Sequence, residues 1–274
     1  MHAIFFRGRG FLALAALFCT ASLTAQQPTF GPPACTQIPA DHAHPTQAEI
    51  MQIKERAAAD PSVLVSAEPM ENIGTLRYRV RDYAQCKGDG GCYWADLDAQ
   101  YQRAAQLLTQ AASTRKHGEK LALVLDIDET ALSSYCEMQR EDFGFIARSF
   151  NDWIVSADAA VPIQGTLRLV RQAHELGIDL FFITGRPEPQ RQATERNLHA
   201  AGFESWKHLS LRPSASGQIE HSGSTIEYKS WERKKIAEDG YRVVLNVGDQ
   251  WSDLMGEPMA EHSVKLPNPF YYLP

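Results

Sequence analysis

Three carboxylates follow one apolar run in the middle of the sequence. The segment LALVLDIDET, residues 121–130, ends with Asp126, Asp128 and Glu129 after five apolar residues. Two carboxylates two positions apart can divide a reaction, one attacking an electrophile while the other transfers a proton. Residues 121–125 show no alternation of apolar and polar side chains, which predicts a strand covered on both faces, as in a parallel α/β sheet. The acids would then lie at the carboxyl edge of that sheet, where such folds bind their ligands.

Two later apolar runs also end in polar residues suited to binding. Residues 178–183 lead into T-G-R, and residues 242–247 lead into G-D-Q-W-S-D. A hydroxyl, a backbone N–H and a fixed positive charge suit phosphate oxygens, while Asp126 and Asp249 could share a hard cation such as Mg²⁺, which prefers oxygen ligands. Besides the acids after the first run, we assign to this site Thr184, Gly185, Lys229, Asp249 and Asp253. The set indicates phosphoryl transfer.

The D-I-D-E-T sequence could alternatively open a calcium-binding loop. Such a loop requires a glycine at its sixth position and a glutamate at its twelfth. Counted from Asp126, these positions hold Ala131 and Glu137, so only the second requirement is met. Phosphoryl transfer is therefore the favoured interpretation.

The segment IEYKSWERKKI offers three lysines that could face a phosphate. Lys229 precedes Ser230, which we expect to cap a helix, so Lys229 would lie at the positive end of the helix dipole. Lys234 and Lys235 fall inside the same helix, where charged side chains usually face solvent. We therefore select Lys229.

Four motifs in order resemble those of the haloacid dehalogenase-like superfamily. They are DIDET at 126–130, ITGR at 183–186, YKSWER at 228–233 and GDQWSDL at 248–254. The residues of these motifs are most similar to those of the acid phosphatase branch. This branch includes plant acid phosphatases, vegetative storage proteins and bacterial lipoprotein acid phosphatases. The resemblance runs from about residue 121 to residue 256.

This resemblance implies a role for each matched residue. Asp126 would be the nucleophile that takes the phosphoryl group as an aspartyl-phosphate, and Asp128 would be the general acid and then the base for the hydrolytic water. Thr184 and Lys229 would hold the phosphoryl oxygens, with the backbone N–H of Gly185 beside them.

The resemblance also implies a set of Mg²⁺ ligands. The metal would be held by the Asp126 carboxylate, the Asp128 backbone carbonyl and Asp249, with Asp253 acting through water or as a brace for the others. Glu129 is expected to shape the turn that follows the strand.

The rest of the chain predicts a Rossmann-like parallel sheet with helices on both faces and a helical extension before it. We expect helices near residues 46–59 and 93–114, the second with apolar residues at spacings of three and four. The predicted division is a signal peptide at 1–25, an irregular lead-in and helical extension at 26–118, and a catalytic domain at 119–274.

The beginning of the chain has the layout of a secretory signal peptide. Arg7 and Arg9 precede a short apolar stretch that closes on small residues near Ala25. No later segment approaches the roughly 20 apolar residues of a membrane helix, so we expect no transmembrane segment. The protein is predicted to be periplasmic or secreted; lipid attachment at Cys19 is less favoured, because Phe18 precedes it.

The net charge limits the kinds of binding partner that we expect, and the cysteine content indicates the cellular compartment. Without the two arginines of residues 1–25, 25 basic residues face 33 acidic ones, a formal charge of −8, so nucleic acid is not an expected partner. Four cysteines then remain, an even number that favours disulfides in an exported chain. Cys86 and Cys92 flank the turn sequence KGDGG and are predicted to pair.

We therefore predict an Mg²⁺-dependent acid phosphatase that hydrolyses small phosphomonoesters. A phosphotransferase on the same scaffold and a non-catalytic storage or binding protein are the alternatives. The storage proteins of the branch lack the nucleophile, which this chain keeps as Asp126. A homo-oligomer is possible.

Overall fold

The computed structural model of the 274-residue chain describes residues 30–35, 44–67, 69–213 and 223–273. The predicted signal peptide at 1–25 lies outside these residues. The fold is built on one five-stranded sheet in which every pair of neighbours is parallel. From one edge to the other, its strands are β3 (His208–Arg212), β2 (Asp179–Pro187), β1 (Lys120–Leu125), β4 (Tyr241–Gly248) and β5 (His262–Lys265).

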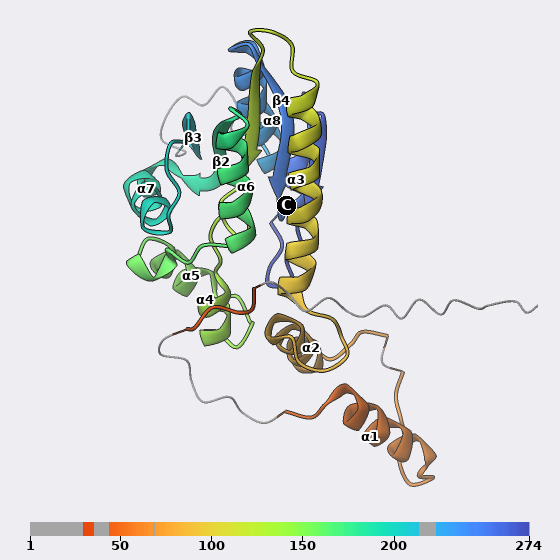
Figure 1. The fold of residues 1–274 in the computed structure, drawn as a ribbon. Coiled ribbons are helices and arrows are strands. Elements are labelled where there is room, and N and C mark those ends of the chain that lie inside the picture. Colours follow the sequence, from red (N-terminus) through yellow and green to blue (C-terminus); the bar gives the residue numbers. More distant parts are fainter. Residues whose placement is uncertain (1–29, 36–43, 68, 214–222, 274) are drawn as a thin grey trace, which may run out of the picture.

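The central strand β1 is covered on both faces. Leu121, Leu123 and Leu125 belong to the large apolar core that includes residues of α3 (Tyr93–Ser113) and α6 (Gln164–Glu175). Ala122 and Val124 pack in a second cluster with residues of α8 (Thr225–Glu238). Helices α3 and α6 lie in front of the sheet and α8 behind it (Figure 1). This arrangement confirms the predicted fold class and explains the unbroken apolar run.

Further helices complete the structure. They are α1 (Gln47–Ala59), α2 (Ile73–Gln85), α4 (Tyr135–Arg140), α5 (Ala147–Ile154), α7 (Arg191–Ala200) and α9 (Trp251–Leu254), with 3-10 turns at Ala157–Ala159 and Glu188–Gln190. The helices predicted near 46–59 and 93–114 are α1 and α3. Helix α2 was not predicted; of its residues only Arg81 and Ala84 are buried, while the apolar side chains of Ile73 and Leu76 are exposed.

Helix α3 joins the N-terminal extension to the sheet. A Cβ added at Gly165 of α6 would lie 2.2 Å from the ring of Tyr101 in α3, so these two helices approach closely only because residue 165 has no side chain. The Tyr101 hydroxyl donates to the backbone carbonyl of Thr130 at 2.7 Å. The extension thus contacts the loop after β1 directly, while the division at residues 118 and 119 stays a prediction.

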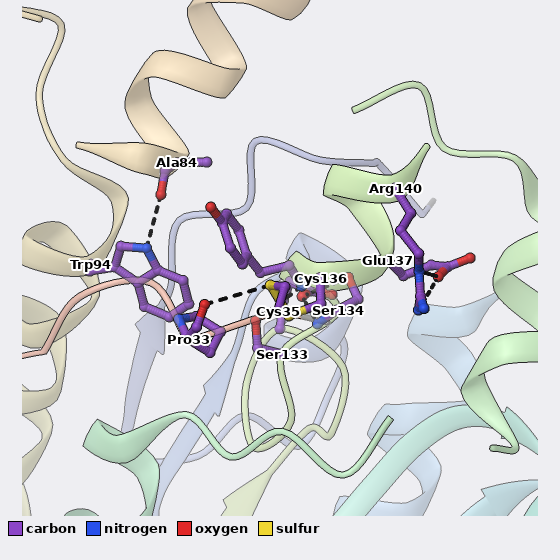
Figure 2. The surroundings of a disulfide bond; sticks show 11 residues. Pro33, Cys35, Ala84, Trp94, Ser133, Ser134, Cys136, Glu137 and Arg140 are labelled. Carbon is purple, nitrogen blue, oxygen red and sulfur yellow. Dashed lines mark hydrogen bonds and ion pairs between the residues drawn. A yellow bond between two sulfur atoms is a disulfide. The ribbon is translucent and has the colours of Figure 1, made fainter. Parts of the chain in front are cut away.

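Two disulfides join parts of the described chain. Cys86 and Cys92 pair across the turn between α2 and α3, as predicted. Cys35 and Cys136 pair over 101 residues, a loop length for which the chain-entropy treatment gives about 4–5 kcal/mol of stabilisation. Figure 2 shows this second bond beside Ser133 and Ser134, at the end of the loop that follows β1. Among the described residues, no helix combines the length and the apolar character needed to cross a membrane.

Candidate active site

The carboxyl ends of β1 and β4 bring three acids together. Asp126 directly follows β1, Asp249 directly follows β4, and Asp253 lies in the short helix α9. All three are buried, and each offers one oxygen to a group whose members all lie within 4.8 Å of one another. Gly248 permits this approach, since a Cβ there would lie 2.3 Å from Oδ2 of Asp253. Three of the four aspartates that the sequence assigned to a metal therefore converge; Asp128, which was assigned through its backbone carbonyl, is not in this group.

A pocket of about 700 Å³ opens above these acids. Its lining includes the predicted site residues Asp126, Asp128, Gly185, Lys229, Asp249 and Asp253. Thr184 is fully buried beside the pocket, and its hydroxyl accepts a hydrogen bond from the backbone N–H of Arg186 at 3.2 Å. Phe145, Phe150 and Tyr271 form one side of the pocket and contact one another.

Lys229 lies at the bottom of this pocket between two of the acids. Its Nζ donates to Oδ1 of Asp126 at 2.6 Å and to Oδ1 of Asp253 at 2.5 Å. Burial opposes the charged ammonium, but the two carboxylates outweigh this effect and raise the pKa of Lys229 above its usual range. The lysine is therefore held as a cation next to Asp126.

The predicted start of the helix that carries Lys229 was wrong. Helix α8 begins at Thr225 with Ser224 as its N-cap, and Ser224 and Glu227 form a reciprocal capping box. Lys229 consequently lies in the second turn, and Ser230 is inside the helix. The sequence STIE at 224–227 carries the capping signal that places this start.

The three acids carry more negative charge than Lys229 can balance. Burial, followed by the charge of Asp253, raises the pKa of Asp249 to about 7. Burial also raises the pKa of Asp126 well above its usual range, although Lys229 opposes this change. Buried carboxylates in excess of their cations are the expected ligands of a hard divalent ion, so the residues present fit Mg²⁺.

Arg186 holds the carboxylate of Asp128, the second acid of the first motif. Its Nε donates to Oδ2 of Asp128 at 3.0 Å and its second terminal nitrogen donates to Oδ1 at 2.6 Å, which makes a two-pronged ion pair. A third nitrogen reaches the hydroxyl of Thr194 at 3.3 Å. The sequence alone gave no indication that Arg186 would contact Asp128.

Glu129 shapes the loop after β1, as the sequence predicted. It has a positive φ of 52° and is fully buried. Its carboxylate accepts hydrogen bonds from the backbone N–H and hydroxyl of Ser134 at 2.6 and 2.8 Å and from the hydroxyl of Tyr271 at 2.5 Å. The loop that carries Asp126 and Asp128 is thereby held in one conformation.

Comparison with known proteins identifies the family. The model of the HAD superfamily, subfamily IIIB (acid phosphatase), matches residues 48–274. The chain belongs to this subfamily. The match includes the helical extension as well as the four motifs.

Proteins similar to this subfamily IIIB chain include examples from plants and, by fold, from a bacterium. Acid phosphatase 1 of Solanum lycopersicum is 39% identical over 153 residues, which are 55% of this chain and 58% of that protein. Vegetative storage protein 1 of Arabidopsis thaliana is 34% identical over 154 residues, 55% of each chain. The chain thus spans somewhat more than half the length of these curated relatives. A solved class C acid phosphatase from Bacillus anthracis, with tungstate bound, shares the fold with a TM-score of 0.52 and 23% identity over 72% of this chain and 86% of that one.

Residues 266–273 of the subfamily IIIB chain also reach the site, although the sequence did not indicate them. Asn268 donates to Asp249, and Tyr271 donates to Glu129. Gln250 donates to Asp249 and accepts the backbone N–H of Leu273, so it also connects Asp249 to this segment. Asn268 is a polar residue within the otherwise apolar run LPNPFYYL, and this was the signal in the sequence that could have indicated the contact.

Proposed function

We propose that this protein is a phosphomonoesterase that hydrolyses small phosphomonoesters through an aspartyl-phosphate on Asp126. The observation that carries this proposal is the ion pair between Asp126 and Lys229, 2.6 Å long, at the bottom of a pocket that also contains Asp128. A carboxylate beside a fixed ammonium can attack an anionic phosphorus centre that it would otherwise repel. Membership of the acid phosphatase subfamily supports the same activity.

The residues divide the reaction between them. An oxygen of Asp126 forms a bond to phosphorus as the bond to the leaving alcohol breaks, and Asp128 gives that alcohol a proton. Asp128 then takes a proton from water, which attacks phosphorus and releases the Asp126 carboxylate. Lys229 and the Thr184–Gly185 segment contact the phosphoryl oxygens.

Asp126, Asp249 and the backbone carbonyl of Asp128 would hold Mg²⁺. When bound, this ion neutralises charge on the phosphoryl oxygens. Asp253 is better suited to bracing, because its Oδ1 already accepts from Lys229 and its Oδ2 accepts from the backbone N–H of Gln250 at 2.7 Å.

Removal of divalent ions is expected to abolish the activity. Without a cation, burial favours the protonated form of Asp126, which is a poor nucleophile, and no divalent charge is present to bind a phosphate dianion. Aryl, nucleotide and sugar phosphates should be tested before and after treatment with EDTA, and again after Mg²⁺ is added. Tungstate, which the Bacillus anthracis structure holds, should inhibit competitively. Full turnover after exhaustive chelation would exclude the metal from the mechanism, and phosphate transfer to added alcohols would favour a phosphotransferase.

Asp128→Asn should slow the hydrolysis of substrates with poor leaving groups most. The substitution keeps the shape that Arg186 contacts but removes the transferable proton. Alkyl phosphates should lose about 10²–10⁴-fold in kcat/KM, the usual contribution of general acid catalysis, while activated aryl phosphates should lose much less. The measurement is kcat/KM against the pKa of the leaving alcohol. Equal losses across the series would contradict the assignment of Asp128 as the acid.

We also propose that the protein is exported and that residues 119–274 form its catalytic domain. Two disulfides support export, since such bonds persist in oxidising compartments. The signal-like residues 1–25 support the same conclusion.

A further inference from the structure

The segment after β5, residues 266–273, is anchored beside the acids. The backbone N–H of Leu266 donates to the carbonyl of Gly248 at 2.9 Å, which continues the pairing of β5 with β4. The ring of Phe270 is buried, with its centroid 5.2 Å from that of Tyr93 and 6.0 Å from that of Phe143. The two anchors fix the residues between them.

Asn268 lies between these anchors and contacts Asp249. Its Nδ2 donates to Oδ2 of Asp249 at 2.7 Å, and Nε2 of Gln250 donates to the same oxygen at 2.6 Å. Oδ1 of Asp249 receives only the hydroxyl of Thr130, at 3.3 Å, among the described residues. Two amides therefore hold one oxygen and leave the other for a cation.

The backbone of the same segment sets the orientation of both amides. Oδ1 of Asn268 accepts the backbone N–H of Phe270 at 2.8 Å, and Oε1 of Gln250 accepts that of Leu273 at 3.1 Å. Because a backbone N–H can only donate, the amide oxygens must face the segment and the amide nitrogens must face Asp249. Neutral donors hold the carboxylate without supplying a charge that would replace the cation.

We propose that Asn268 is a positioning residue for the divalent cation, which it serves by fixing the carboxylate of Asp249. This inference rests on the proposed function, because it requires that Asp249 bind a metal. Partners that orient a ligating carboxylate typically contribute 10–100-fold to metal affinity. Asn268 should therefore change the affinity for Mg²⁺ more than the rate of the loaded enzyme.

The test is a titration of the full chain with Mg²⁺ alone. Binding is measured by calorimetry and by the change in melting temperature. Asn268→Ala removes both the donor to Asp249 and the acceptor for Phe270. Asn268→Ser keeps an oxygen that can accept the same backbone N–H, but its side chain is too short to replace the amide at Asp249. Tyr272→Ala, at an exposed position of the same segment, is the matched control.

Both Asn268 variants should bind Mg²⁺ about 10–100-fold more weakly than the unchanged protein, whereas Tyr272→Ala should not differ. At saturating Mg²⁺, kcat should return to within a few-fold of the unchanged value. If Asn268→Ser binds Mg²⁺ as tightly as the unchanged protein, the segment's turn and not the amide matters, and the inference is wrong. A lower melting temperature of metal-free Asn268→Ala would mark a folding defect. In that case the Mg²⁺ affinity of Asn268→Ser alone tests the inference.

Asp249→Asn separates this inference from the proposed function. If the unchanged protein binds Mg²⁺ and Asp249→Asn does not, the metal site exists, and unaltered affinity in both Asn268 variants overturns the role of Asn268 alone. If the unchanged protein shows no binding that depends on Asp249, the proposed metal site fails and the inference fails with it.

Discussion

Asp126→Asn is expected to lower kcat by on the order of 10⁴-fold or more with every phosphomonoester. The amide has the shape of the carboxylate but cannot form the aspartyl-phosphate, so both half-reactions are lost. The loss should be similar for activated and unactivated esters, in contrast to the graded loss at Asp128. Steady-state kinetics across the leaving-group series would measure it.

The same substitution should leave the fold intact. Asp126 is buried with Asp249 and Asp253, so one negative charge fewer reduces their mutual repulsion, and Lys229 keeps the carboxylate of Asp253 as its partner. We expect the metal-free melting temperature to be equal to that of the unchanged protein or higher. Asp152→Asn, an exposed neutralisation in α5, should change neither activity nor stability. Retention of more than a few per cent of activity in purified Asp126→Asn would exclude Asp126 as the nucleophile.

Lys229→Ala should weaken transition-state stabilisation by roughly 3 kcal/mol or more, which is about 10²-fold in kcat/KM. The ammonium lies between Asp126 and Asp253, so its loss removes the positive charge nearest the attacking oxygen. The two carboxylates also lose their partner, and breaking a buried pair costs about 3–5 kcal/mol of folding stability. Kinetics and thermal unfolding should therefore both change.

Lys234→Ala and Lys235→Ala provide matched controls from the same helix. Their side chains are 48% and 49% exposed and pair with Glu238 and Glu232, whereas that of Lys229 is 6% exposed. Each control should cost under about 1 kcal/mol in stability and leave kcat/KM nearly unchanged. A large kinetic loss at Lys235 with near-normal Lys229→Ala kinetics would show that the wrong lysine was chosen.

The sheet and the acids could be predicted because their signals are local. Residues 121–125 lack alternation because both faces of β1 are covered, and a strand end followed by Asp126 places that acid at the carboxyl edge. Parallel neighbours then bring Asp249 to the same edge, although the two residues lie far apart in the sequence. Periodicity and topology sufficed for these features.

Contacts between single side chains could not be predicted in this way. The pairing of Arg186 with Asp128 depends on how the end of β2 lies against the loop after β1, and no spacing encodes it. Asn268 reaches Asp249 because β5 pairs in parallel with β4, so the segment after β5 begins beside the end of β4. The role of Lys229 stays a prediction from the family motif; the structure places this lysine beside Asp126, and its position in the helix was misjudged.

The proposed role of residues 266–273 would also affect when the protein can bind its metal tightly. These residues follow all four motifs, so at about 5–20 residues per second Asn268 is synthesised roughly 7–30 s after Asp126. Until it emerges, Asp249 lacks one of the amides that orient it. Under the proposed role of Asn268, the site would therefore reach its full affinity for the metal only after residues 266–273 have been made.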